Sequence, residues 1–368
     1  MWEFPTSMLP KIRAVWALLL AVLCGLAGAV GGYLLHGATG GAANSQGSTI
    51  TNQTLSITAA GTLGVVFPQA ARALANLTPG IQVPLAAEHF QGSVAALSAV
   101  EQPGVYYDVA SSADFRLVHA MLEPTYASWE VLYGTQPEVL AYDPSASALA
   151  GISATNWAWK ITAPGILLGV ANQSTDPNGY NGIFTLELQG LFANGSLSTV
   201  YQHFYSNPPG SYAQPNPSTT RVEPEANAAT LLSTHVVQAF IIYRSYAIQH
   251  HLSYVDLDPH VNLGNLSTSM IQYYAQATTE VLNGGGPATS LVTGAPVAFS
   301  ATVPLSATNA TLGDLFVHFL VSPQGTSLLS EDGFTPIVPA YADNPSALPP
   351  MLGPMVEPLP STLQALLS

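Results

Sequence analysis

Basic residues are scarce in this chain, and their scarcity excludes nucleic acid as a partner. Only seven of the 368 residues are Lys or Arg, against 21 Asp and Glu, so the formal net charge is −14. Two of the seven, Lys11 and Arg13, precede the first apolar run. A protein that binds DNA or RNA needs a basic surface to neutralise phosphates. We therefore expect no nucleic-acid partner.

Cysteine and charge are also nearly absent. The single cysteine, Cys24, lies inside an apolar segment, which excludes disulfides and thiolate metal sites. Charged residues make up 8% of the chain, far below the roughly 25% of ordinary soluble domains. Hydrophobic residues nevertheless make up 48%, with 16 Tyr and 12 Phe, so we expect a large folded core and not a disordered chain.

Motifs typical of enzymes and metal sites are missing as well. The sequence has no G-x-S-x-G, no Walker motif and no G-x-G-x-x-G between a strand and a helix. His250 and His251 are adjacent, so on a helix they face different directions and cannot form a metal pair. We predict a protein that is not an enzyme and that has no resident metal or cofactor.

Residues 14–35 form a run of 22 residues without a charge. As a helix, this run spans the roughly 30 Å hydrocarbon core of a bilayer. Lys11 and Arg13 lie just before it, so the positive-inside rule places residues 1–13 in the cytoplasm and the folded part outside the cell. We expect a single-pass anchor in the cell membrane, followed by a flexible Gly-, Ala- and Ser-rich linker over 36–54.

Two alternatives to a retained anchor are a cleaved signal peptide and a lipid on Cys24. Lipidation is the weaker of the two, because Leu23 stands where a small residue is required. The chain also carries N-x-S/T sequons, which agree with an exported glycoprotein. They lie at Asn52, Asn76, Asn172, Asn194, Asn265 and Asn309. The proline-rich C-terminal tail over 341–368 is expected to wrap the surface or to be loosely ordered.

Between the linker and the tail, strand and helix patterns alternate. Strands are predicted at 55–60 and 81–84, and further strands include one that ends at Ser111 or Ser112. A continuous late helix is predicted over 311–333. Alternation of this kind indicates an α/β fold with a parallel, doubly wound sheet.

In such sheets a ligand binds outside the carboxyl ends of the strands, where helix N-termini attract anions. Three strand-to-helix junctions have the glycine or hydroxyl residues that suit this position. They are Gly61-Thr62, Ser111-Ser112 and the turn at 176–179. Each of them also suits a simple tight turn.

Four motifs in this order resemble the archaeal tungstate/molybdate-binding proteins of ABC transporters. The motifs are DVASSADF from Asp108, STDPNGY from Ser174, the run from Ile241 to Leu263, and GFTPIVPA from Gly333. The resemblance implies a type II periplasmic-binding-protein fold with two α/β lobes around a cleft. Lobe 1 would hold 55–137 and 297–340, and lobe 2 would hold 138–296, with crossovers at EVLAY and AFSATV.

The same resemblance implies a set of oxyanion-binding residues. Gly61 and Thr62 match the family's first turn, and Ser112 matches its second hydroxyl. Asp176, Pro177 and Asn178 match a turn whose carboxylate binds the metal of the oxyanion. Asp176 equally suits a helix N-cap before Pro177.

One position departs from the family. Family members have a second carboxylate, a Glu directly before Tyr-Arg-Ser, and here that residue is Ile242, ahead of Tyr243. Six-coordinate binding by two carboxylates is then in question. A tetrahedral site is the alternative, in which Tyr243 donates its hydroxyl as in the related bacterial proteins; Tyr243 also suits a core position.

We therefore expect a solute-binding protein that captures tungstate or molybdate and delivers it to an ABC permease and its ATPase. The alternatives are the same fold with another oxyanion such as sulfate, or a cell-surface structural glycoprotein that has lost transport.

Overall fold

The computed structural model describes residues 54–77, 85–282 and 288–367. The predicted anchor, nearly all of the predicted linker and the predicted strand at 81–84 lie outside the described residues. Over these three ranges, no helix is both long and apolar enough to cross a membrane.

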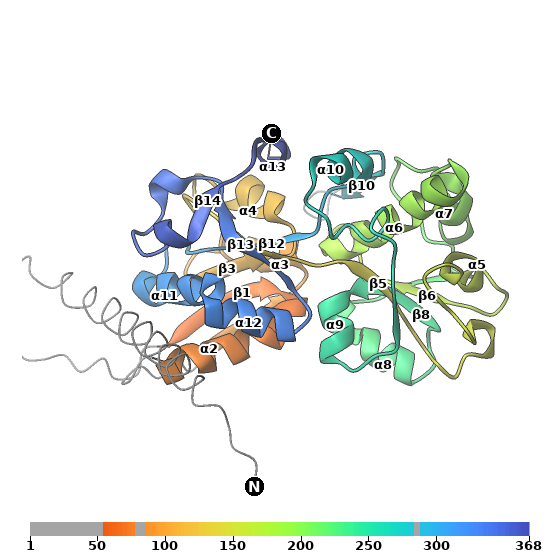
Figure 1. Ribbon diagram of the computed structural model, residues 1–368, viewed down its shortest axis with the longest axis horizontal. Coiled ribbons are helices and arrows are strands. Elements are labelled where there is room, and N and C mark those ends of the chain that lie inside the picture. The colour runs from red at the N-terminus through yellow and green to blue at the C-terminus, as the bar shows by residue number, and fades with distance from the viewer. Residues whose placement is uncertain (1–53, 78–84, 283–287, 368) are drawn as a thin grey trace, which may run out of the picture. The chain divides into compact units, whose positions relative to one another are not determined.

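The first of two main sheets has seven strands, and it combines segments from both ends of the chain (Figure 1). In spatial order they are β14 (Val356–Pro358), β13 (Thr335–Ala342), β4 (Val131–Thr135), β12 (Ala298–Thr302), β3 (Val109–Ser112), β1 (Leu55–Ala60) and β2 (Leu85–Gln91). We call the part of the chain built on this sheet the first lobe.

The second main sheet has five strands and forms the second lobe. In spatial order they are β7 (Thr220–Val222), β6 (Leu168–Val170), β8 (Ala239–Tyr243), β5 (Glu138–Tyr142) and β9 (Tyr254–Asp256). A separate hairpin joins β10 (Thr278–Leu282) and β11 (Thr289–Thr293).

Both main sheets are mixed, so the prediction of a parallel sheet is wrong in part. β1 is parallel to β2 and β3, but β12 is antiparallel to β3 and β4. β5 is antiparallel to both of its neighbours. The reason is the connection between the lobes. The chain leaves the first sheet along β4 and returns along its neighbour β12, so these two strands must run in opposite directions (Figure 1).

Helices cover the sheets of both lobes. The α-helices of the first lobe are α2 (Val66–Leu77), α3 (Ser93–Ser98), α4 (Phe115–Leu122), α11 (Ala310–Val321), α12 (Pro323–Glu331) and α13 (Ser361–Gln364). Those from 157 to 274 are α5 (Trp157–Ile161), α6 (Pro177–Asn194), α7 (Ser198–Phe204), α8 (Ala228–Ser233), α9 (Arg244–Gln249) and α10 (Thr268–Tyr274). Short 3₁₀ turns include η2 (Gly61–Gly64), before α2, and η4 (Glu225–Asn227), before α8.

The single helix predicted over 311–333 is two helices, α11 and α12, and the break is at Ser322. Pro323 has no N–H to continue the first helix. The Ser322 hydroxyl instead accepts a hydrogen bond from the Gly325 N–H at 3.1 Å and caps the second helix. Gly325 lies so close to the Phe319 carbonyl that no Cβ would fit there.

The proline-rich C-terminal segment packs against the first lobe. β14 pairs in parallel with β13, and Leu352, Leu359 and Leu363 are buried. Leu359 and Leu363 share a cluster with Phe115 of α4, so this segment covers that side of the first sheet.

Candidate ligand site

The two lobes meet through hydrogen bonds between buried side chains. The Thr62 hydroxyl of the first lobe donates to Glu225 Oε1 of the second at 2.5 Å. The Tyr180 hydroxyl of the second lobe donates to Asp114 Oδ2 of the first at 2.7 Å. Both bonds join a strand-to-helix junction of one lobe to the other, so the candidate site lies at this seam.

From the first lobe, Thr62 reaches the seam directly. It lies in η2, directly after β1, where Gly61 begins the turn, and only 2% of its surface is exposed. Ser112 ends β3 and is also buried, but its hydrogen bonds stay in its own turn. Its hydroxyl donates to the Asp114 carbonyl at 2.7 Å and accepts from the Asp114 N–H at 3.0 Å.

From the second lobe, the turn before α6 brings Asp176, Pro177 and Asn178 to the seam. Asp176 caps the helix, and its Oδ1 accepts from the Asn178 N–H at 3.0 Å. Pro177 takes the first helical position, where its missing N–H costs nothing. α6 is 18 residues long, so its N-terminus adds a partial positive charge at this point.

Tyr243, the last residue of β8, is fully buried beside this turn. Its hydroxyl accepts from Asn181 Nδ2 at 3.2 Å, and its ring packs edge-on against Phe299 of β12. The neighbouring carboxylates of Glu138, Asp176 and Glu225 all help to raise the pKa of Tyr243, after the larger effect of burial. Tyr243 thus keeps its proton and lies among the acidic groups of the seam.

Glu138 and Glu225 belong to this group although the sequence analysis did not select them. Glu138 begins β5 and is buried; its Oε2 accepts from Asn178 Nδ2 at 3.3 Å. Glu138 Oε1 and Asn178 Oδ1 are buried without a hydrogen-bond partner in the described structure. The sequence could have indicated a ligand-binding role for Glu138, because it is a charged residue in the otherwise apolar strand EVLAY. Acidic residues are common in the first turn of a helix, so the position of Glu225 did not indicate such a role.

The three carboxyl groups of the seam hold protons more tightly than usual. Burial raises the pKa of Asp176 to about 6. Burial, and then repulsion between the three groups, raises the pKa values of Glu138 and Glu225 well above their usual range. Near neutral pH, Glu138 and Glu225 can donate hydrogen bonds to an oxyanion, or lose a proton when they bind a metal centre, whereas Asp176 is mostly ionised.

Ile242, where the resembling family has Glu, contributes nothing polar to the seam. Its side chain lies in an apolar cluster with Val139, Phe240 and Tyr246. Glu225 lies at the edge of the same cluster, because the Tyr246 hydroxyl donates to the carbonyl of the next residue, Ala226, at 3.0 Å. The carboxyl group of Glu225, from η4 and not from β8, instead reaches Thr62 at the seam.

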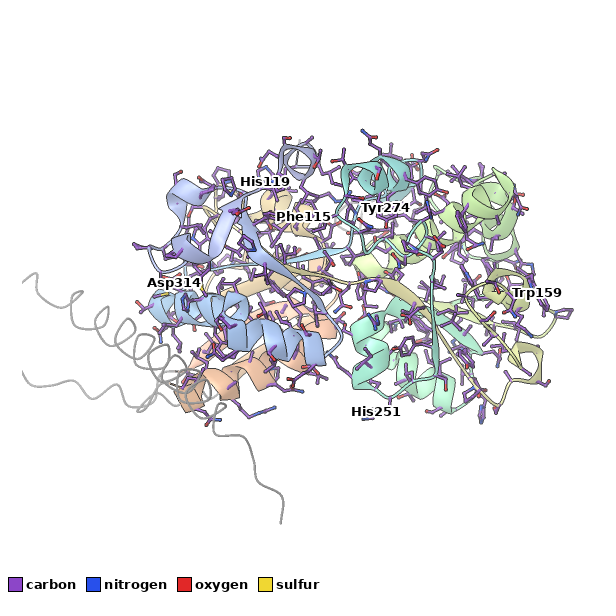
Figure 2. The ribbon with its side chains drawn as sticks, in the orientation of Figure 1. Phe115, His119, Trp159, His251, Tyr274 and Asp314 are labelled. Atoms are coloured by element: carbon purple, nitrogen blue, oxygen red, sulfur yellow. The ribbon has the colours of Figure 1, made fainter. Side chains whose placement is uncertain are left out.

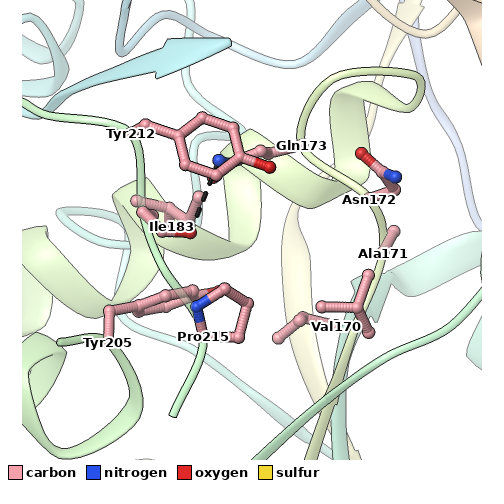
Figure 3. A pocket seen from close by; sticks show the side chains of 10 residues that line it. Val170, Ala171, Asn172, Gln173, Ile183, Tyr205, Tyr212 and Pro215 are labelled. Carbon is pink, nitrogen blue, oxygen red and sulfur yellow. Dashed lines mark hydrogen bonds between the residues drawn. The ribbon is translucent and has the colours of Figure 1, made fainter. Parts of the chain in front are cut away.

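Two hollows lie near the turn at 172–178. The larger, of about 280 Å³, is lined by Asp176 of the second lobe and by Gly92 of the first. The smaller, of about 50 Å³, is lined by second-lobe residues that include Tyr205 and Tyr212 (Figure 3). Gln173 closes it with a 3.4 Å hydrogen bond to the Ala213 carbonyl, and its size suits water. Of these two hollows, only the larger is lined by a carboxyl group of the seam, that of Asp176.

Comparisons with known proteins agree with this geometry. A model of the bacterial extracellular solute-binding proteins matches residues 55–335. A solute-binding protein of Methanoculleus marisnigri is 29% identical over 274 residues, which are 70% of this chain and 76% of that protein. The molybdate/tungstate-binding protein WtpA of Thermococcus kodakarensis is 26% identical over 252 residues, 66% of this chain and 70% of that one. The resemblance predicted from four motifs is confirmed.

A solved structure shows the same fold. The periplasmic molybdate-binding protein of Azotobacter vinelandii superposes with a TM-score of 0.51 at 14% identity, covering 76% of this chain and 98% of that one. The predicted periplasmic-binding-protein fold, with two α/β lobes, is thereby confirmed.

Proposed function

We propose that this chain, which belongs to the bacterial extracellular solute-binding protein family, captures tungstate or molybdate between its lobes. The main support for this proposal is the hydrogen bond from the Thr62 hydroxyl of the first lobe to Glu225 Oε1 of the second, at 2.5 Å and beside Asp176. Groups from both lobes then contact one ligand, so binding favours the closed state.

The carboxyl groups of Asp176 and Glu225 favour binding of a metal oxyanion over binding of sulfate. An ionised carboxylate beside a doubly charged anion is repelled unless it binds the central atom directly. Tungsten and molybdenum can accept two more oxygen ligands, whereas the sulfur of sulfate remains four-coordinate. We assign Asp176 and Glu225 as these two ligands. Thr62, Asn178 and Tyr243 would donate hydrogen bonds to the oxyanion oxygens, with Gly61 and Pro177 shaping their turns.

Calorimetric titration of the full chain, in a mild detergent, tests the ligand. Tungstate and molybdate should bind with a Kd below about 1 μM, and sulfate and phosphate at least about 100-fold more weakly. Thr62→Ala and Tyr243→Phe should each weaken binding. If a folded sample gives no heat with any of the four anions, the proposal fails and a structural surface role takes its place.

Closure of the lobes is tested at Gly92, before α3. A Cβ at this position would overlap the Thr175 carbonyl of the second lobe. We expect Gly92→Ala to hold the lobes apart and to weaken tungstate binding by at least about 30-fold, or roughly 2 kcal/mol. Gly353→Ala is the control, because no atom lies within 4 Å of its added Cβ. Small-angle scattering should show ligand-induced compaction in the wild type and the control but not in Gly92→Ala; compaction of that variant would refute the closure model.

We also propose that the folded part is held outside the cell by the apolar segment over 14–35 and serves an ABC permease and ATPase. The absence of charge in that segment, and Lys11 and Arg13 before it, support this orientation. Protease treatment of intact cells should release the folded part from the membrane.

A further inference from the structure

A second group of ionisable side chains lies in the first lobe, at the end of α4 opposite to Asp114. His119 Nδ1 is 2.9 Å from Glu123 Oε2 and 3.9 Å from Asp343 Oδ2. One ligand atom from each of the three residues lies within 4.8 Å of the others. Figure 2 shows His119 on α4, beside the blue C-terminal ribbon.

The fold holds these three side chains in place. His119 and Glu123 are four residues apart, so they share one face of α4 and its C-terminal end. Asp343 directly follows β13, and its Oδ1 accepts from the Glu130 N–H at 2.7 Å. A helix and a segment about two hundred residues later in the chain therefore meet at one point.

The group has more negative charge than its protein partners can balance. Glu130 is fully buried, and neither of its carboxyl oxygens has a hydrogen-bond partner among the described residues. Glu123 Oε1 is likewise buried and unpaired. In the described part of the chain, no Lys or Arg forms an ion pair with Glu123, Glu130 or Asp343.

Glu130 faces this group from the sheet. It directly precedes β4 and points to the same side as Leu132, which packs against Phe115 of α4. Burial has the largest effect on the pKa of Glu130 and raises it; the Ser300 hydroxyl lowers this pKa, and repulsion from Asp343 and Glu123 raises it further.

We propose that His119, Glu123 and Asp343 bind a divalent transition-metal ion such as Zn²⁺, with Glu130 accepting a hydrogen bond from a metal-bound water. One imidazole nitrogen and two carboxylate oxygens form a ligand set that Zn²⁺ uses with water in the fourth position. Ca²⁺ and Mg²⁺ prefer oxygen ligands alone, so the imidazole nitrogen of His119 disfavours them. The ion would link α4 to the C-terminal segment.

Calorimetry with ZnCl₂, on the full chain at about pH 7.5 and without any oxyanion, tests the site. We expect one ion per chain with a Kd of about 10 μM or lower. Zn²⁺ should raise the Tm by about 5 °C relative to EDTA, and Mg²⁺ should not.

Two variants separate metal binding from a structural role. Glu123→Gln keeps the shape of the side chain but removes its carboxylate, so it should fold normally but lose the Zn²⁺ response. His119→Ala should also lose it, since that side chain is 37% exposed and its removal leaves the core intact. His260→Ala is the matched control, because His260 contacts Asp258 at 2.8 Å without a third ligand.

Absence of stoichiometric Zn²⁺ binding by the wild type would overturn the proposal, as would equal Zn²⁺ binding by Glu123→Gln and His119→Ala. Either result would assign the three side chains a structural role only. Because no oxyanion is present, failure here leaves the proposed transport function unaffected.

Discussion

The protein should become strongly destabilised as the pH rises from about 4 to about 8. Several carboxyl groups are buried without a cation, and burial raises the pKa values of Glu123 and Glu187 to about 8. A raised pKa in the folded state contributes stability that is complete below the ordinary value of about 4.3. It is lost as the pH rises towards the folded-state pKa. Glu130 and Glu138 are shifted in the same direction.

The expected loss is large because several groups act together. One fully buried carboxyl with a pKa shifted from about 4.3 to about 8 changes the free energy of unfolding by up to about 5 kcal/mol. Thermal unfolding should therefore show a Tm at least about 10 °C lower at pH 8 than at pH 4, in the presence of EDTA. Asp114, Asp143 and Asp258 have lowered pKa values, so stability should also fall below about pH 4.

The substitution Glu187→Gln tests how much one of these buried carboxyl groups contributes to the pH dependence of stability. Glu187 is buried in α6; its Oε2 accepts from the Thr278 N–H at 3.0 Å, and its Oε1 has no partner among the described residues. Glutamine keeps an acceptor oxygen but carries no charge at any pH. The variant should gain several kcal/mol at about pH 8 and change by less than about 1 kcal/mol at pH 4. The exposed Glu357→Gln is the control, and equal pH profiles for Glu187→Gln and the wild type would refute this account.

Glu225→Gln should weaken tungstate binding by at least about 100-fold, or roughly 2.7 kcal/mol. Glutamine can still accept the hydrogen bond from Thr62, so the contact between the lobes is kept. The substitution removes the anionic carboxylate oxygen that can bind tungsten. Asp176→Asn should have an effect of the same size, because it removes the other carboxylate.

Glu357→Gln is the control for Glu225→Gln. Glu357 is exposed on β14, at the edge of the first sheet, so tungstate affinity should change by less than about 3-fold. X-ray absorption at the tungsten edge should report six oxygen neighbours in the wild type and fewer in Glu225→Gln. Four neighbours in the wild type, with unchanged affinity in Glu225→Gln, would instead favour the tetrahedral site centred on Tyr243.

Local sequence patterns predicted the elements that depend on few neighbours. The strand at 55–60 and the strand that ends at Ser112 follow from apolar runs and turn residues. The Asp176-Pro177 helix start is likewise a local signal. The break at Ser322 was missed, because the apolar period continues across it, although Pro323 indicated it.

The sequence by itself determined the family, a large core with few charges, and the turns that carry Thr62, Ser112 and Asp176. These features depend on composition, short-range periodicity and motif order. Only the tertiary structure decided the mixed strand directions and the approach of Glu225 to Thr62, 163 residues apart in the chain. It alone also brought Asp343 to His119 and Glu123. The partner of a buried carboxyl group depends on which distant segments of the chain pack against it, and local sequence patterns do not contain that information.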